Sequence, residues 1–167
     1  MPVEYELDVG ELNIDEGKEL GAGDFGRVNA ATYRCEKCAV KRMLNGDRYA
    51  VSSFAQEARF MAVLRHRNIC RLIAAKLDTN KPIIAIEFAD RGSLFGVLED
   101  CSIVLDGWKL TGDANRFGFA LDTARGLAAL HSFDPPLVHR DMKADNVLVR
   151  KDWSCFIGPF RRLHRYY

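Results

Sequence analysis

The sequence of 167 residues has few cysteines and almost no net charge. Its five cysteines are an odd number, scattered along the chain, and its formal net charge is +1. This cysteine usage is not typical of a disulfide framework and favours a reducing, cytoplasmic or otherwise intracellular compartment. A chain without charge excess has no general attraction to nucleic acid or to anionic membranes. We therefore expect local motifs to define its partners.

Long apolar segments are absent from the sequence too. No stretch approaches the roughly 18 uninterrupted apolar residues that a membrane-spanning helix needs. The opening residues, MPVEYELDVGE, hold neither a basic leader nor an apolar run, so we expect no secretory signal and a solvated lead-in. With 48% hydrophobic and 28% charged residues and no repeat or linker, the composition predicts one globular domain or part of one.

The periodicity of the first half predicts strands and then a helix. From Gly10 to Val40, short β-like stretches broken by glycine, and by a polar turn around residues 36–37, predict antiparallel strands. A capping-box spacing, Ser53 to Gln56, predicts that an amphipathic helix opens there. Its expected buried face consists of Phe54, Ala58, Met61 and Leu64 or Arg65.

The second half predicts one buried strand and two helices. PIIAIEF, residues 82–88, has the β-branched apolar character of a buried strand, and Ser93 is expected to cap a short helix over 94–98. Residues 115–132 again have helical spacing. The expected buried stripe of this helix comprises Phe117, Leu121, Ala124 and Ala128, with Ala120 and Leu127 beside it.

LGAGDFGRV places three glycines in the pattern G-x-G-x-x-G: Gly21, Gly23 and Gly26. The missing side chains let backbone N–H groups approach a phosphate closely. A strand-like segment follows instead of a helix, so a hairpin over a nucleotide fits better than a Rossmann turn. Taken alone, the pattern is better explained by a glycine-rich turn without a ligand.

Lys41 and Glu57 form the second candidate pair. Lys41 ends a strand-like segment and should point away from Val40, and alone it is best explained as a solvated lysine. Glu57 emerges beside the apolar stripe of the first helix, where a carboxylate is costly unless it is paired. We therefore expect Lys41 on a neighbouring strand to pair with Glu57.

The most specific motif is VHRDMKADNVLV. It contains His139, Arg140 and Asp141, followed by Asn146 five residues after the aspartate. This matches the catalytic loop H-R-D-x-x-x-x-N of protein kinases, and the chain resembles that family from about Leu12 to Asp152. The glycine loop, the strand lysine, the helix glutamate and the catalytic loop occur in the order of that family. Together they outweigh the explanation of each motif as a feature without a function.

The resemblance implies a protein kinase that transfers phosphate from ATP, with Mg²⁺, to serine or threonine of protein substrates. The implied catalytic residues are Asp141, Lys143, Lys41 and Glu57, with Asn146 as a metal ligand. The implied ATP-binding residues are Gly21, Gly23, Gly26, Val28, Ala39, Lys41, Glu87, Ala89 and Leu148, with Ile86 guarding the inner pocket and Phe88 in the hinge. Lys143 is similar to the lysine that serine/threonine kinases place near the γ-phosphate. The stretches DPPLVHRDMK and EFADRGSL resemble the tyrosine-kinase-like group of those kinases.

The same resemblance implies an α+β, two-lobed kinase fold. Its expected parts are a lead-in over 1–11, a β-rich lobe with hinge over 12–89, a partial helical lobe over 90–154 and an atypical tail over 155–167. We expect the helical lobe to be truncated after the catalytic loop, which leaves part of the 117–128 stripe uncovered. The chain alone should then be marginally stable or aggregate.

Pro159 departs from the family pattern. Counting on from Asn146, the metal-binding D-F-G triplet would fall on Pro159, Phe160 and Arg161, and only the phenylalanine agrees. A truncated or frame-shifted gene model, a degenerate pseudokinase and an authentic short isoform each explain this, and the abrupt loss of the motif favours the first. The alternative to an enzyme is therefore a non-catalytic ATP-binding scaffold.

Two further features indicate no site of their own. Cys35 and Cys38 form a C-x-x-C without the second pair that a zinc site needs. The basic, aromatic tail RRLHRYY is too short to specify a nucleic-acid surface, so no nucleic-acid partner is expected.

Overall fold

The computed structural model describes residues 3–23, 26–44, 48–79, 81–100, 104–106, 109–110, 116–158 and 164–165. It consists of two compact units, Met1–Arg65 with Arg71–Phe88, and His66–Cys70 with Ala89–Tyr167. The boundary after Phe88 falls within the predicted hinge. Among the described residues, no helix is long and apolar enough to cross a bilayer.

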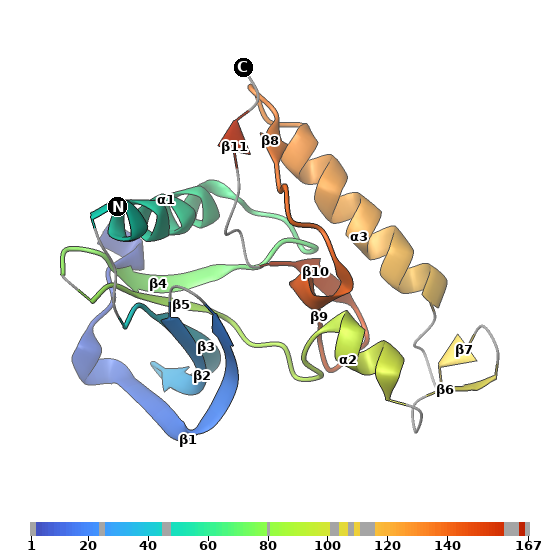
Figure 1. Cartoon of the computed structure of the whole chain (residues 1–167), viewed down its shortest axis with the longest axis horizontal. Coiled ribbons are helices and arrows are strands. Elements are labelled where there is room, and N and C mark those ends of the chain that lie inside the picture. The colour runs from blue at the N-terminus through green and yellow to red at the C-terminus, as the bar shows by residue number, and fades with distance from the viewer. Residues whose placement is uncertain are drawn as a thin grey trace. The chain divides into compact units, whose positions relative to one another are not determined.

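The first unit is a five-stranded antiparallel sheet with one long helix (Figure 1). The strand order is β1-β2-β3-β5-β4. The strands are β1 (Leu12–Gly23), β2 (Gly26–Tyr33), β3 (Glu36–Arg42), β4 (Leu72–Lys76) and β5 (Ile83–Glu87). The helix α1 (Arg48–Val63) packs against β4.

The turn between β2 and β3 lies two residues before its predicted place. Arg34 and Cys35 both have positive φ, 47° and 64°, which matches the mirror-image turn that joins two strands with the native twist. Glu36 and Lys37 therefore already belong to β3. The prediction of a turn at 36–37 was wrong because its polar residues lie on an exposed strand end.

Helix α1 begins at Arg48, four residues before the predicted start near Ser52. Ser53 and Gln56 thus lie inside the helix, and the capping-box prediction was wrong. The expected buried face is confirmed at Phe54, Ala58 and Met61, and Leu64 just after the helix is also buried. The spacing of the apolar residues predicted the buried face of the helix correctly but did not predict where the helix begins.

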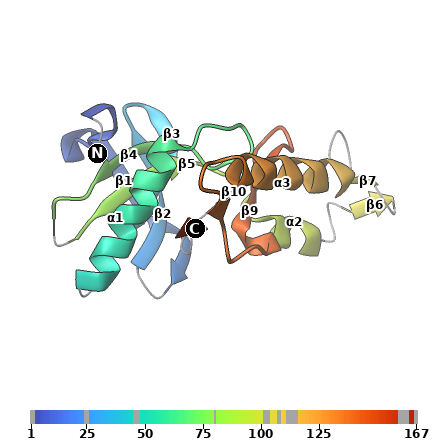
Figure 2. The same ribbon diagram turned by 90° about the horizontal axis from the view of Figure 1, so that it is seen from above.

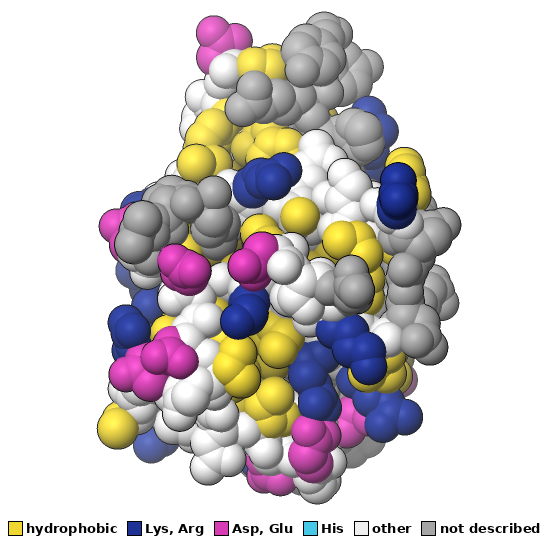
Figure 3. Space-filling model, turned by 90° about the vertical axis from the view of Figure 1, so that its left-hand side faces the viewer, with side chains coloured by type: hydrophobic (Ala, Val, Ile, Leu, Met, Phe, Trp, Pro, Cys, Tyr) yellow, Lys and Arg dark blue, Asp and Glu magenta, His cyan; other side chains and the backbone are white. Residues whose placement is uncertain are grey.

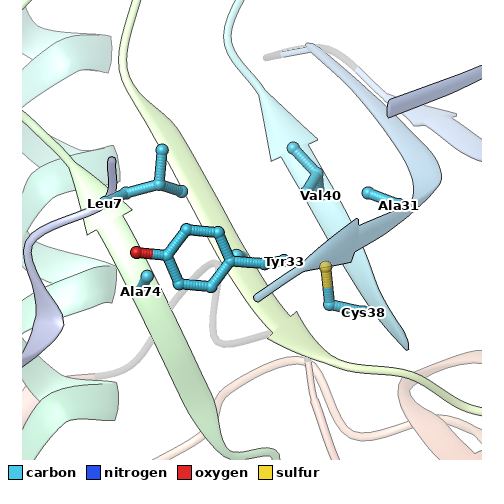
Figure 4. Packing of buried hydrophobic residues seen from close by; sticks show 7 residues of the cluster. Leu7, Ala31, Tyr33, Cys38, Val40 and Ala74 are labelled. Carbon is cyan, nitrogen blue, oxygen red and sulfur yellow. The ribbon is translucent and has the colours of Figure 1, made fainter. Parts of the chain in front are cut away.

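The acidic start of the chain is only partly solvated. Leu7 donates its N–H to the carbonyl oxygen of Ala75 in β4, at 3.0 Å, and so covers that edge of the sheet. Tyr5 and Leu7 are buried, whereas the acidic residues that alternate with them, Glu4, Glu6 and Asp8, are exposed. Figure 4 shows the Tyr33 ring reaching toward Leu7 and Ala74 within the core of this unit. The expectation of a wholly solvated lead-in was wrong because its alternate apolar residues point inward.

The second unit contains two helices and short strand pairs. The helices are α2 (Leu94–Glu99) and α3 (Arg116–His131), which run near each other in Figure 2. The pairs are β9 (Val147–Val149) with β10 (Cys155–Ile157), β8 (Leu137–Val138) with β11 (His164–Arg165), and β6 (Val104–Asp106) with β7 (Lys109–Leu110). Ser93 caps α2 as predicted, since its Oγ accepts the N–H of Gly96 at 3.2 Å.

Helix α3 buries a different stripe from the one predicted. Its buried residues are Phe119, Gly126 and Leu130, and Gly126 packs so tightly that a Cβ there would lie 2.5 Å from the carbonyl oxygen of Asn68. Phe117, by contrast, is 76% exposed. The predicted stripe residues Ala120, Ala124 and Leu127 line an apolar pocket of about 590 Å³ beside α2 instead of a filled core. The helix carries apolar residues on several sides, and among the described elements it packs mainly against β10 and β8.

Candidate active site

A buried ion pair, Lys41–Glu57, joins the sheet and the helix of the first unit. The Lys41 Nζ from β3 donates to Glu57 Oε2 from α1, and each residue is only 7% exposed. The ammonium also lies 5.1 Å from the centroid of the Phe54 ring. Val40 points to the opposite face, as the alternation of a strand requires. The predicted pairing is therefore present, and its catalytic role stays a prediction.

Three other predicted site residues share the sheet face of Lys41. Val28 in β2 lies directly opposite Lys41 in the register, and Ala39 lies directly opposite Ile86 of β5. Opposed residues of antiparallel strands project to the same face, and Ala39 is two residues from Lys41 on its strand. The sheet therefore presents a small apolar surface next to a fixed ammonium.

The three glycines lie in the hairpin of β1 and β2. Gly21 opposes Val28 and Gly23 opposes Gly26, while residues 24–25 at the tip lie outside the described residues. Gly26 has φ of 150°, and a Cβ there would lie 1.9 Å from the carbonyl oxygen of Arg42. Only glycine fits at this position, because any side chain would collide with the neighbouring strand.

The predicted hinge begins where β5 ends. Glu87 is the last residue of β5, and its N–H donates to the carbonyl oxygen of Arg71 at 3.0 Å. Lys37 lies over the Phe88 ring, 3.8 Å from its centroid. Ala89 starts the second unit, and its carbonyl oxygen accepts the N–H of Gly92 at 3.2 Å. The role of this backbone in reading adenine stays a prediction.

The second unit contains the predicted catalytic loop. The side-chain amide of Asn146 donates to the Asp141 carbonyl oxygen at 2.6 Å and to Asp141 Oδ2 at 3.1 Å. Asn146 is buried, while Asp141 is half-buried and Lys143 is exposed. Asn146 thus closes the loop by holding both the backbone and the carboxylate of Asp141. Because the side-chain NH₂ group of Asn146 is used in this way, the side-chain oxygen Oδ1 is the atom suited to a cation.

Two neighbours fix this loop in place. Leu148 follows it in β9 and forms an isolated bridge with Ser93. Gly158 donates its N–H to the backbone carbonyl oxygen of Asn146 at 2.9 Å, so the residue directly before Pro159 is bound to the catalytic loop. Pro159, Phe160 and Arg161 lie outside the described residues.

The described residues contain no cluster of metal-binding side chains. Among them, no group of three or more His, Cys, Asp or Glu side chains could hold a metal ion. Magnesium in nucleotide sites takes many of its ligands from phosphates and water. The amide oxygen of Asn146 therefore fits a magnesium ion that arrives with a nucleotide and does not fit an ion held by protein alone.

The C-x-x-C cysteines occupy unlike surroundings. Cys35 is exposed in the turn after β2, whereas Cys38 is fully buried in the sheet core. Burial, and to a lesser extent the nearby Glu36 carboxylate, raise the pKa of the Cys38 thiol to about 11. A thiol with this pKa is protonated at neutral pH and is a poor nucleophile and metal ligand.

Sequence reasoning missed one polar cluster of the hairpin, formed by Arg42, Glu16 and Asn29. Arg42 hydrogen-bonds both other residues. The only signal in the sequence was that Arg42 follows Lys41 directly. The partners could not be predicted because β1 has irregular register between Ile14 and Glu19.

Comparison with known proteins identifies the family. The family model described as protein tyrosine and serine/threonine kinase matches residues 14–164. The chain therefore belongs to the protein kinase family, and the α+β fold with its β-rich first unit is that of a kinase domain.

Curated relatives have serine/threonine kinase names. The chain is 35% identical over 161 residues to the probable serine/threonine-protein kinase drkD of Dictyostelium discoideum. The matched region covers 95% of this chain and 12% of that protein. It is 36% identical over 159 residues to the probable serine/threonine-protein kinase SIS8 of Arabidopsis thaliana, and the match covers 92% of this chain and 15% of that protein. For CTR1 of the same plant the identity is 34% over 152 residues, covering 90% and 18%. The chain thus spans less than a fifth of the length of each of these relatives.

Proposed function

We propose that this chain carries the ATP-binding and catalytic-loop parts of a serine/threonine protein kinase. The reaction would move the γ-phosphoryl group of ATP to a serine or threonine hydroxyl of a protein substrate. The observation that carries the proposal is the buried Lys41–Glu57 pair on the same sheet face as Val28 and Ala39. Since ATP is the co-substrate, the proposal also implies an intracellular protein.

The first unit would bind the nucleotide. Lys41 has three N–H donors, and its pairing with Glu57 keeps the ammonium at one place, where it can meet the α and β phosphates. The backbone of Gly21, Gly23 and Gly26 would cover the phosphates. In this unit, apolar contact with the adenine would come from Val28 and Ala39, and the backbone of Glu87 would read its edge. The family resemblance gives the same two roles to Leu148 and Ala89, which belong to the second unit.

The second unit would serve the hydroxyl substrate. Asp141 would accept or orient the hydroxyl proton, and its carboxylate is held by the Asn146 amide at 3.1 Å. Lys143 is exposed and would offset the charge of the γ-phosphate. Asn146 would direct its amide oxygen to a magnesium ion, which when bound neutralises charge on the phosphates.

Pro159 makes slow transfer the expected behaviour of this chain. A proline supplies no carboxylate where the resemblance implies the main metal ligand, and the described residues contain no replacement cluster. We therefore propose that the chain binds ATP and that its phosphoryl transfer is impaired. A non-catalytic ATP-binding scaffold is the second candidate, and the same residue favours it.

Calorimetric titration of the chain with ATP, with magnesium and with EDTA, tests the binding step. We expect ATP to bind the wild-type chain and binding to be lost in Lys41→Met. The control Lys81→Met removes an exposed lysine in the β4–β5 connection and should bind ATP as the wild type does. Equal ATP binding by wild type and Lys41→Met, or no binding by wild type, would refute the proposal.

Phosphoryl transfer is measured separately with γ-labelled ATP and a serine/threonine-containing protein substrate. Transfer that is lost in Asp141→Asn supports the enzyme. Binding without transfer in the wild type, and a gain of transfer in Pro159→Asp, would assign the defect to the metal ligand. If the wild type and Pro159→Asp both bind ATP but neither transfers phosphate, the non-catalytic ATP-binding scaffold is favoured.

A further inference from the structure

A polar cluster connects three strands on the sheet face opposite to Lys41. Arg42 of β3 donates from Nη1 to Glu16 Oε1 at 2.7 Å and from Nη2 to Glu16 Oε2 at 2.6 Å. Its Nη2 also donates to Asn29 Oδ1 of β2 at 3.0 Å. Asn29 in turn donates from Nδ2 to the Asp15 carbonyl oxygen of β1 at 3.4 Å. Each strand of the glycine hairpin is thus bonded to β3 through one guanidinium.

This cluster differs from the exposed ion pairs of the same unit in that its arginine is largely buried and has a second, buried partner. On the face shown in Figure 3, acidic and basic side chains are interspersed, and exposed pairs of this kind contribute little. Arg42, however, is only 22% exposed at its side chain and also binds Asn29, which is 2% exposed, whereas Glu16 is 67% exposed and has both carboxylate oxygens bound to Arg42. The two-pronged, charge-assisted contact with Glu16 fixes the orientation of the guanidinium, and the buried Asn29 amide anchors it. The hydrogen bonds from Arg42 also lower the pKa of Glu16 from its usual value.

The cluster holds an irregular part of β1. The register passes from Ile14 opposite Ala31 to Glu19 opposite Asn29, so four residues of β1 face a single residue of β2. Such a bulge interrupts the ladder hydrogen bonds that would otherwise fix the strand. Glu16 lies within this bulge, so its contact with Arg42 replaces part of the missing ladder.

Arg42 also contacts the hairpin through its backbone. The site of a Cβ on Gly26 lies 1.9 Å from the Arg42 carbonyl oxygen, so the start of β2 is packed directly on this residue. Arg42 therefore touches both strands of the hairpin and is the immediate neighbour of Lys41.

We propose that Arg42, Glu16 and Asn29 are positioning residues that hold the glycine hairpin against the strand bearing Lys41. This inference rests on the proposed function, since the hairpin is to cover the phosphates of ATP. A glycine-rich segment loses much conformational freedom when a ligand orders it. The cluster lowers that cost because the hairpin is already ordered before ATP binds.

Amide hydrogen exchange of the nucleotide-free chain tests the positioning directly. In Glu16→Gln and in Arg42→Lys we expect exchange of the described hairpin amides, residues 19–23 and 26–28, to rise about tenfold. The double variant should rise no further than the worse single variant, because both changes remove one shared contact. The matched control is Arg27→Gln, which breaks the exposed pair of Arg27 with Glu19, 3.6 Å apart on the same hairpin, and should leave exchange unchanged.

Titration with ATP then tests the functional consequence. We expect the Kd for ATP to rise about fivefold in Glu16→Gln and Arg42→Lys and to stay unchanged in Arg27→Gln. Unchanged hairpin exchange in the first two variants would overturn the positioning role, even if the wild type binds ATP. Faster exchange with an unchanged Kd would also overturn it. If the wild type bound no ATP, the proposed function would fail, whereas the exchange data would still show whether the cluster orders the hairpin.

Discussion

Removing one partner of the Lys41–Glu57 pair should destabilise the first unit strongly. Glu57→Gln leaves the Lys41 ammonium in surroundings where both residues are 7% exposed, with no compensating charge. Loss of one partner of a buried ion pair costs about 3–5 kcal/mol. We expect about 3 kcal/mol, because the adjacent Phe54 ring keeps some attraction for the ammonium. For a chain of this length that corresponds to a fall in Tm of about 6–12 °C.

Thermal and urea unfolding followed by circular dichroism measures this cost. The informative companion is the double variant Lys41→Met, Glu57→Leu, which replaces both charges by apolar groups. We expect it to be as stable as the wild type or more stable, within about 1–4 kcal/mol, while losing ATP binding. A Glu57→Gln variant with wild-type stability would show that the pair is not buried as described. A double variant less stable than Glu57→Gln would refute the electrostatic reasoning.

Three further predictions concern packing, thiol chemistry and surface. Gly126→Ala should lower the free energy of unfolding by more than about 1 kcal/mol in urea denaturation, because its Cβ has no space, whereas Gly96→Ala, with its nearest contact at 3.7 Å, should be neutral or stabilising. Iodoacetamide at pH 8 should label Cys35 and spare Cys38, whose pKa is raised to about 11; labelling of both at equal rates in the native chain would contradict the buried position. Phe117→Glu should reduce aggregation in light scattering without changing Tm, since that ring is 76% exposed, and unchanged aggregation would show that this face is not the cause.

Much of the candidate site could be predicted because its motifs are local. The glycine spacing, the strand lysine and the loop from His139 to Asn146 each lie within a few residues of sequence. The Lys41–Glu57 pair was also predictable, since a carboxylate beside an apolar helix stripe needs a cation. The strand over 83–87 and the cap of α2 at Ser93 followed from patterns equally short.

The errors all concern choices between equivalent local patterns. Helix α1 begins at Arg48 although Ser53 offers a good capping spacing, and Ala50 in its first turn is buried. Helix α3 carries apolar residues on several sides, and its packing against β10 and β8 decides which of them are buried. Periodicity alone gives these sides the same weight.

The order of residues along the chain was enough to identify the kinase family and the motifs of the candidate site, because each motif is short and is defined by residue type and spacing. Tertiary structure alone decided which faces are buried and how Arg42 reaches Glu16 across a bulge of β1. The physical reason is that burial and ion pairing depend on what lies opposite in space, and residues 26 positions apart carry no local signal that they will meet.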